Sequence, residues 1–445
     1  MPKITHRKKR LSSFKLIVLG FAGVIVLGAL ILMLPFSSTA GVVTPFHEAL
    51  FTSTSAVCVT GLVVQDTGSY WSAFGQTVIL LLIQIGGLGV VTVAALFAML
   101  SGRKISLMQR STMQDAISAP KVGGIVRLTR FIVRGTFLIE LIGMIIMLPT
   151  FCGNYGIKGI WMAAFHSVSA FCNAGFDILG TAENKYPSLT GYIGNPAINI
   201  AIMLLIIVGG IGFLTWDDIY TNKWHFKKYR MQSKVILVTT AILIIVPAVF
   251  FFFCDFTGLP LAERILASLF QSVTPRTAGF NTADLPAMTS SSKAIMTLLM
   301  LVGGSPGSTA GGMKTTTLAV LILSAFSVCR KKDDAEVCGR RIDGSAVKNA
   351  AAVAVMYFLL FFVGGIVIST AEGLPLSTCL YETASAVGTV GLTLGITPQL
   401  GVLSQLILIV LMYLGRVGGL TLIYAAVSNK NQSGAKLPLE KITVG

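Results

Sequence analysis

The sequence predicts an all-α polytopic membrane protein. We expect four parallel membrane–pore–membrane repeats around a central pore, with eight spanning helices and four re-entrant pore helices. Three observations lead to this fold class: an apolar composition, eight long apolar stretches, and one short phrase that occurs four times. Of the 445 residues, 54% are hydrophobic and only 12% are charged. Because soluble proteins are about 25% charged, this chain lacks their polar coat.

The eight apolar stretches are long enough, or nearly so, to cross a bilayer as helices. They cover residues 14–34, 74–100, 125–150, 197–215, 233–254, 293–328 with a break, 346–370 and 402–427. The first stretch is too long for the apolar part of a signal peptide, so we interpret it as the first span.

The formal net charge of +16 arises from 34 basic and 18 acidic residues. Most of the basic residues fall in the N-terminal arm, in the connections 101–134, 216–234 and 329–348, and in the C-terminal tail. Short loops with such a bias are cytoplasmic. We therefore expect a multi-pass protein of the cell membrane with both termini in the cytoplasm. The charge indicates orientation and contact with lipid headgroups, and it does not indicate a nucleic-acid partner.

The four outer connections each carry a short apolar segment, at 47–57, 160–171, 262–273 and 377–387. These segments are too short to span, and each runs into a turn that contains glycine. They are typical of re-entrant helices, because irregular backbone at membrane depth is tolerated only inside protein or along a water-filled path.

The phrase Ser-Ala-Val-Cys-Val-Thr-Gly-Leu at residues 55–62 has three counterparts, which end at about one-quarter intervals of the chain. Its glycines are Gly61, Gly175, Gly279 and Gly391. The third copy is shorter by one residue. Such regular recurrence predicts a pseudo-symmetric architecture. We place the four units at residues 1–110, 111–228, 229–340 and 341–445.

Four extended loops that meet at a centre can replace the hydration shell of potassium with backbone carbonyl oxygens. Glycine suits this task because it adopts backbone angles that aim successive carbonyls in one direction. The helices that precede the loops would point their partly negative C-terminal ends toward a cation. The predicted ion-selectivity filter comprises Val59, Thr60, Gly61, Asn173, Ala174, Gly175, Thr277, Ala278, Gly279, Thr389, Val390 and Gly391.

These motifs make the chain resemble the Ktr/Trk/HKT superfamily of potassium transporters, and in particular the bacterial KtrB membrane subunits. The resemblance covers almost the whole chain. It implies one filter glycine per repeat, and a glycine at the first position, here Gly61, goes with potassium preference. It also implies a homodimer that sits on a cytosolic ring of nucleotide-binding KtrA-like subunits, which would regulate potassium uptake.

The sixth apolar stretch is interrupted by a segment too rich in glycine and proline for a helix to continue. The spacing of a phosphate-binding loop fails here, because Met313 separates Gly312 from Lys314. We interpret residues 303–316 as a gating loop that crosses the pore beneath the filter, as the resemblance also implies. The predicted gate residues are Gly303, Gly304, Ser305, Pro306, Gly307, Gly311, Gly312, Lys314 and Arg416.

Arg416 lies within the last apolar stretch, where a charge must face protein or water. It either holds backbone carbonyls, or a carboxylate, in place, or forms a cationic constriction under the filter. Lys314 would add a second electrostatic barrier.

The other reactive residues in the sequence give little support to other classes of protein. The seven cysteines form no CxxC pair, and the four histidines are far apart, so we expect no disulfide framework, resident metal or cofactor. Without paired carboxylates or a nucleophile–base pair, we expect no enzyme. The alternative function is a sodium- or proton-coupled cation carrier, which usually needs inverted repeats and intramembrane acids.

Overall fold

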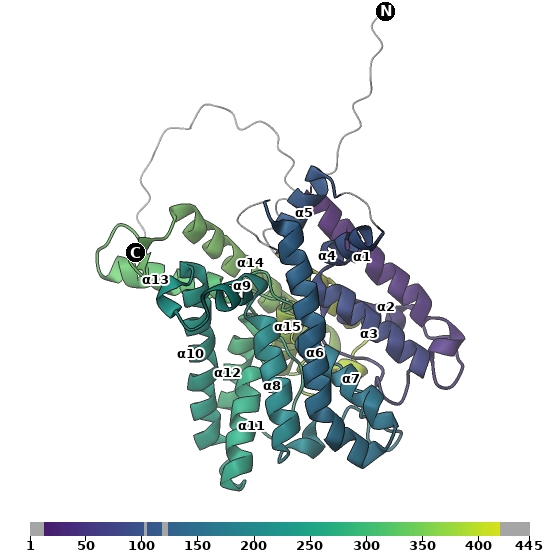
Figure 1. The fold of residues 1–445 in the computed structure, drawn as a ribbon. Helices are drawn as coiled ribbons and strands as arrows, with labels where there is room; N and C mark the ends of the chain where they lie inside the picture. Colours follow the sequence, from purple (N-terminus) through teal and green to yellow (C-terminus); the bar gives the residue numbers. More distant parts are fainter. Residues whose placement is uncertain (1–12, 102–104, 118–122, 419–445) are drawn as a thin grey trace, which may run out of the picture.

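The computed structural model describes residues 13–101, 105–117 and 123–418. The basic arm before Ser13 and the tail after Gly418 lie outside the described residues. The described chain is mostly helical (Figure 1). Its helices are α1 (Ser13–Leu32), α2 (Phe46–Cys58), α3 (Ala73–Leu88), α4 (Val90–Leu100), α5 (Leu107–Ile117), α6 (Ile125–Tyr155), α7 (Lys158–Phe171), α8 (Pro196–Gly210), α9 (Phe213–Asn222), α10 (Met231–Cys254), α11 (Leu261–Val273), α12 (Ser290–Leu301), α13 (Thr315–Cys329), α14 (Gly344–Glu372), α15 (Leu376–Gly388) and α16 (Val402–Val417).

Four long helices, α1, α6, α10 and α14, are apolar and long enough to cross a membrane. In the most apolar part of each of these helices, only about a third of the residues are buried inside the protein. Their other faces expose large apolar side chains such as Leu27, Leu138 and Phe358. Apolar surface of this extent belongs against lipid, and the chain is therefore a membrane protein.

Two stretches that we predicted as continuous spans, 74–100 and 197–215, are broken. Helices α3 and α4 meet at 96°, and α8 and α9 meet at 98°. The breaks lie at Gly89 and Gly212, whose φ angles of +84° and +90° are accessible to glycine but costly for other residues. These bends were not predicted from the sequence, and they arise because the two glycines allow the backbone to turn.

The remaining apolar helices, α12, α13 and α16, are short. Residues 302–314 separate α12 from α13, as the sequence predicted. Helix α16 ends at Val417, and the rest of the predicted span 402–427 lies outside the described residues. By length and composition, the described chain therefore has four helices long enough to span, or six when each bent pair counts as one. The predicted sixth and eighth spans correspond to the shorter helices α12, α13 and α16.

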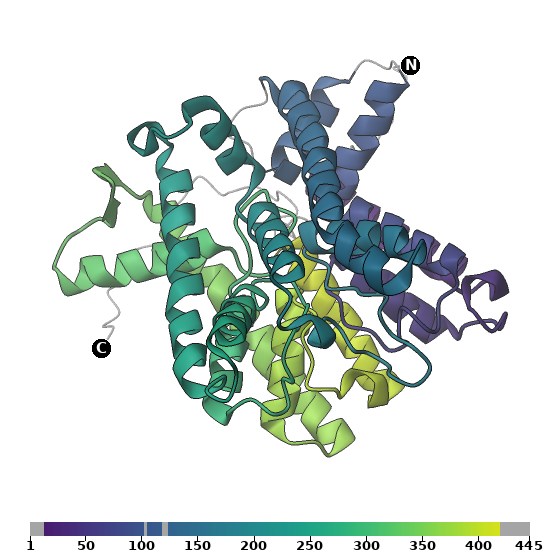
Figure 2. The same cartoon turned by 60° about the horizontal axis from the view of Figure 1, so that its bottom comes forward.

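Four short helices, α2, α7, α11 and α15, occupy the segments predicted to be re-entrant. Each packs against the long helix that precedes it in the chain. Each is also more deeply buried than that long helix, and its last three residues are buried. Seen from the lower end of Figure 1, successive quarters of the chain follow one another around the molecule (Figure 2). This arrangement brings the C-terminal ends of the short helices together in the interior.

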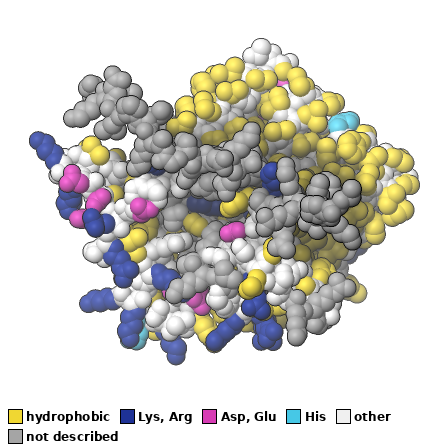
Figure 3. Space-filling model, turned by 90° about the horizontal axis from the view of Figure 1, so that it is seen from above, with side chains coloured by type: hydrophobic (Ala, Val, Ile, Leu, Met, Phe, Trp, Pro, Cys, Tyr) yellow, Lys and Arg dark blue, Asp and Glu magenta, His cyan; other side chains and the backbone are white. Residues whose placement is uncertain are grey.

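The end of the molecule at the top of Figure 1 carries α5, α9 and the antiparallel hairpin of β1 (Glu336–Val337) and β2 (Arg340–Arg341). Seen directly, this end shows many Lys and Arg side chains and few Asp and Glu (Figure 3). The predicted unit boundaries at 110 and 340 fall inside α5 and β2. The connections between units therefore contain secondary structure of their own.

Candidate functional site

The four glycines predicted from the repeated phrase share one backbone conformation. Their φ angles are all positive, at +94°, +69°, +82° and +94° in chain order. The residues two positions earlier also have positive φ, although none of them is glycine. These residues are Val59, Asn173, Thr277 and Thr389, with φ between +52° and +68°. Left-handed backbone is uncommon outside glycine, so its recurrence at four matched positions indicates one shared local structure.

Hydroxyl side chains at the C-terminal end of each short helix, or in the residue directly after it, hold these segments. Ser55 Oγ accepts a hydrogen bond from Gly61 N at 3.1 Å, and Ser385 Oγ accepts one from Gly391 N at 3.0 Å. In the other two units, Ser169 Oγ and Thr274 Oγ1 donate to the carbonyl oxygen of the residue after the glycine. The repeated phrase begins with these residues, although we had assigned them no role.

The four glycines meet in a closed ring. A Cβ atom added to any of them would lie within 3.0 Å of a carbonyl oxygen from the next unit, closer than side-chain carbons approach. The acceptors follow chain order and close on the first unit: Ala174 O faces Gly61, Ala278 O faces Gly175, Val390 O faces Gly279, and Thr60 O faces Gly391. The predicted filter residues are therefore brought together, with the carbonyls that precede the glycines at the contact.

A cavity of about 110 Å³ lies against this ring and is lined by all four glycines. Its other lining residues include those two positions after each glycine: Val63, Asp177, Asn281 and Thr393. Asp66 also lines the cavity, which therefore contains two carboxyl groups and no basic residue. Such a cavity attracts cations.

The two carboxyl groups differ in their surroundings. Asp66 is buried and accepts hydrogen bonds from Ser69 N at 2.8 Å and Tyr186 N at 3.0 Å. Asp177 accepts one from Leu179 N at 3.1 Å. Burial raises the pKa of Asp177 to about 7, against the opposing effect of the Leu179 hydrogen bond and with a smaller contribution from the charge of Asp66. Its charge therefore changes near neutral pH.

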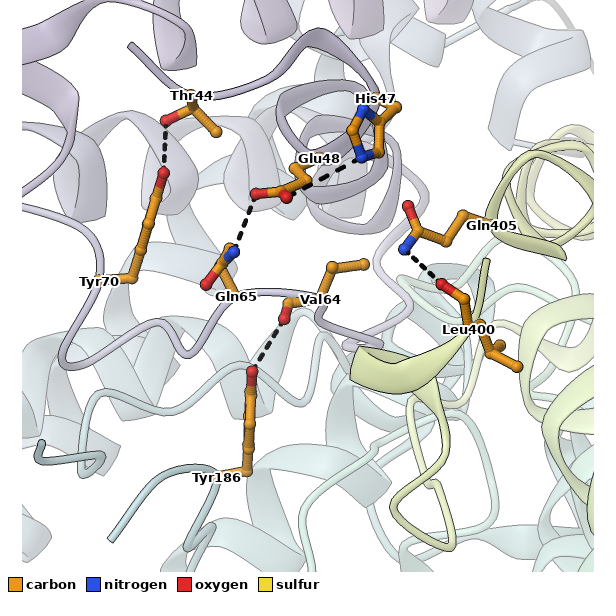
Figure 4. A network of polar contacts seen from close by, with 9 residues as sticks. All are labelled: Thr44, His47, Glu48, Val64, Gln65, Tyr70, Tyr186, Leu400 and Gln405. Atoms are coloured by element: carbon orange, nitrogen blue, oxygen red, sulfur yellow. Dashed lines mark hydrogen bonds and ion pairs between the residues drawn. The ribbon is translucent and has the colours of Figure 1, made fainter. Parts of the chain in front are cut away.

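Polar contacts fix the segment that leads outward from Gly61 (Figure 4). Gln65 Nε2 donates to Glu48 at 2.9 Å, which connects the segment to its own short helix α2. Tyr186 Oη donates to Val64 O at 2.8 Å, which connects the segment to the second unit. The rim of the cavity is thus held between neighbouring units.

The predicted gating loop crosses the interior below the ring. On one side, Ser305 N donates to Gly210 O at 2.9 Å, and Thr309 Oγ1 donates to Phe171 O at 3.1 Å. On the other side, Gly312 N donates to Gly415 O at 3.2 Å. The loop therefore bridges the ends of α7 and α8 to α16, from the second unit to the fourth.

Both predicted gate cations contact backbone carbonyl oxygens. Arg416 donates to Thr309 O of the loop and to Gly86 O at the end of α3. Lys314 Nζ donates to Ala310 O at 2.8 Å and Gly311 O at 3.2 Å. Both line a cavity of about 280 Å³ on the side of the loop away from the ring. Arg416 therefore binds backbone carbonyl oxygens, as one of the two interpretations of the sequence expected, and its role as a cationic constriction stays a prediction.

Two further buried polar residues lie elsewhere, Glu140 and His166. Glu140 in α6 accepts from Gln84 Nε2 at 3.0 Å. His166 Nδ1 lies 2.8 Å from Met162 O within α7, and its ring stacks on Phe151. Within the described residues, no group of three or more His, Cys, Asp or Glu is arranged to hold a metal ion.

Apolar outer helices around a closed ring of backbone carbonyls are typical of membrane proteins that conduct cations. The sequence model of the TrkH family, described as a cation transport protein, matches residues 21–434. The chain belongs to this family.

Relatives of known name align with this chain over almost its full length. The chain is 39% identical to the potassium/sodium uptake protein NtpJ of Enterococcus hirae, over 98% of both chains. It is 37% identical to the Ktr system potassium uptake protein B of Bacillus subtilis, over 97% of this chain and 96% of that one. The crystal structure of the potassium transporter TrkH from Vibrio parahaemolyticus has the same fold, with a TM-score of 0.74 at 19% identity, over 96% of this chain and 87% of that one.

The charge of Asp177 predicts a pH dependence of cation uptake. With a pKa of about 7, its carboxyl group is mostly charged at pH 8 and mostly protonated at pH 6. Because the charged form concentrates cations in the cavity, we expect KM for uptake to be about threefold lower at an outer pH of 8 than at pH 6. In Asp177→Asn, KM should stay at the higher value at both pH values. Uptake kinetics in proteoliposomes measure this, with the exposed Glu183→Gln as control. A pH dependence that survives in Asp177→Asn would contradict the assignment.

Proposed function

We propose that this protein takes up potassium across the bacterial cell membrane, through a path whose selectivity filter is the glycine ring. The observation that carries the proposal is the closed sequence of contacts between each glycine and the carbonyl of the next unit. Backbone carbonyls around a narrow path can replace the water around a potassium ion. The predicted filter residues, from Val59 to Gly61 and their three counterparts, would supply these oxygens, with potassium as the transported ion.

The relatives support potassium as the cargo. Their names assign potassium uptake to the Bacillus protein and potassium/sodium uptake to the Enterococcus protein. Sodium is therefore the competing cation to test. The sodium- or proton-coupled carrier remains the alternative, and dependence of potassium uptake on a sodium or proton gradient would identify it.

We further propose that the chain consists of four parallel repeats, each with a spanning helix, a short re-entrant helix and a second spanning segment. The shared left-handed positions and ring contacts support four equivalent units. The basic end in Figure 3 would face the cytoplasm, as the charge bias of short loops predicts. The cavity with Asp66 and Asp177 would then open outward, and cations would enter at the acidic side.

Substitution of a ring glycine tests the filter. Gly175→Ala adds a Cβ that meets Ala278 O and the backbone of Gly279, so we expect loss of potassium uptake. Gly41→Ala is the matched control, because Gly41 has a similar φ of +67° and no neighbouring atom within 4 Å of the added carbon. The measurement is uptake of potassium, rubidium and sodium into proteoliposomes, with valinomycin to calibrate full equilibration. Normal uptake by folded Gly175→Ala would overturn the proposal.

The loop at residues 303–316 is proposed as the gate. It bridges units two and four beneath the ring, and Arg416 and Lys314 add positive charge there. A cation that leaves the ring toward the basic end meets this loop and both charges. Opening would require the loop to release its hydrogen bonds to Gly210 and Gly415.

Removal of these contacts should open the path. Each hydrogen bond from a charged donor is worth about 1.5–3 kcal/mol, so Arg416→Gln should raise potassium flux by about tenfold or more when the closed state dominates. Deletion of the loop should raise flux at least as much. Lys332→Gln, which removes an exposed charge at the basic end, is the control. Flux at the wild-type level in both gate variants would contradict the gate.

A regulatory partner is proposed from the name of the Bacillus relative, which is a protein of a Ktr system. We propose that this chain forms a homodimer that binds a cytosolic ring of KtrA-like nucleotide-binding subunits. The segment after α13 offers exposed basic residues: Arg330, Lys331, Lys332, Arg340 and Arg341. Two of them already pair, Lys332 with Glu336 and Arg341 with Asp334, which leaves the others better placed to meet an acidic partner.

Charge reversal tests this docking. Lys331→Glu combined with Arg340→Glu should abolish co-elution with a KtrA-type ring subunit on size-exclusion chromatography at low salt. Lys158→Glu, an exposed residue at the start of α7, reverses one charge on the proposed outer side and should leave co-elution unchanged. Retention of the ring by the double variant would count against this surface.

A further inference from the structure

One fully buried carboxyl group has no part in the proposed path. Glu382 lies in the middle of α15 and has 0% of its surface exposed. One carboxyl oxygen accepts a hydrogen bond from Thr393 Oγ1 at 2.8 Å, and the other accepts one from Thr397 Oγ1. A buried carboxyl group is costly unless such bonds satisfy it. Glu382 therefore ties its helix to the chain that follows the fourth glycine.

The matched positions of the other units contain buried polar residues without such a tether. Thr52 and His166 precede their glycines by nine residues, as Glu382 does, and Gln271 has the same place in the shortened third unit. All three are fully buried. Within the described chain, Thr52 Oγ1, His166 Nε2 and both amide atoms of Gln271 lack hydrogen-bond partners. Among these four matched helices, only the fourth has a side chain at this position that is hydrogen-bonded to the segment beyond its glycine.

The tether acts on the edge of the cavity. Thr393 is two residues beyond Gly391 and lines the cavity of about 110 Å³ with the four glycines. Its hydroxyl oxygen also accepts a hydrogen bond from Gly395 N at 3.0 Å, which holds the next turn of chain. Hydrogen bonds in a buried network are stronger than in water, so the carboxyl group fixes the path of residues 391–397.

We propose that Glu382 is a positioning residue for ion selectivity. Through Thr393 it sets the position of the fourth segment of the ring. It thereby sets the spacing of the carbonyl oxygens that distinguish potassium from sodium. The inference rests on the proposed function, because it assigns a role within the same filter. Glu382 does not touch the ion, and its effect passes through the two threonine hydroxyls.

Two isosteric variants separate positioning from folding. Glu382→Gln removes the charge and one acceptor, whereas Thr393→Val removes the donor and leaves the carboxyl group in place with Thr397. We expect both to lower the potassium-to-sodium uptake ratio by about tenfold, equivalent to about 1.4 kcal/mol, while the melting temperature stays close to wild type. The double variant should be no less selective than the worse single variant, because both changes break one interaction.

Gln271→Leu is the matched control, since it removes a buried polar group without a tether at the corresponding position of the third unit. It should retain the wild-type ratio. Wild-type selectivity in folded Thr393→Val would overturn the inference, and so would an equal loss in Gln271→Leu. If Glu382→Gln fails to fold, Thr393→Val decides the question. Failure of the wild-type protein to take up potassium would instead refute the proposed function.

Discussion

The close contact of four glycine backbones is the constraint on which the rest of the molecule depends. Each glycine leaves no room for a Cβ, because a carbonyl oxygen of the next unit occupies that space. The contact is possible only when four segments, far apart in the sequence, arrive at one place with the same backbone conformation. The deeply buried short helices deliver these four segments to the interior. Hydroxyl groups at the ends of the short helices hold the segments in place, and the long apolar helices enclose them.

The ring is symmetric in its backbone and asymmetric in its side chains. The cavity beside the ring is lined at matched places by Val63, Asp177, Asn281 and Thr393, whose side-chain chemistry differs from one segment to the next. The third unit alone carries the long intramembrane loop within the described chain, and that loop reaches both the second and fourth units. We propose that the similar units provide the path for the cation, and that the differences between them provide cation capture, the gate and the positioning of the filter.

Much of this arrangement was predictable, because glycine marks places where the backbone needs conformations or close contacts that other residues do not allow. Four glycines at quarter intervals, each after a short apolar segment, predicted both the short helices and their meeting point. The broken stretch around Pro306 was predictable for the same reason, since its composition does not sustain a helix.

Other features depend on long-range contacts that no local pattern contains. The bends at Gly89 and Gly212 have no distinct signal in the sequence, because glycines in apolar stretches more commonly serve close helix packing. The left-handed conformation of Val59 and its counterparts has no signal in residue type. The bonds of Glu382 to Thr393 and Thr397, and of Arg416 to Gly86, join residues whose proximity arises only after the units assemble.

The most direct test of the ring as an ion site is to locate the ion. Rubidium is a potassium analogue whose anomalous X-ray scattering identifies it in crystals. Crystals grown in rubidium should show an anomalous peak at the centre of the ring formed by the carbonyls of Thr60, Ala174, Ala278 and Val390. A protein that takes up rubidium, yet shows its peaks only away from this ring, would contradict the account.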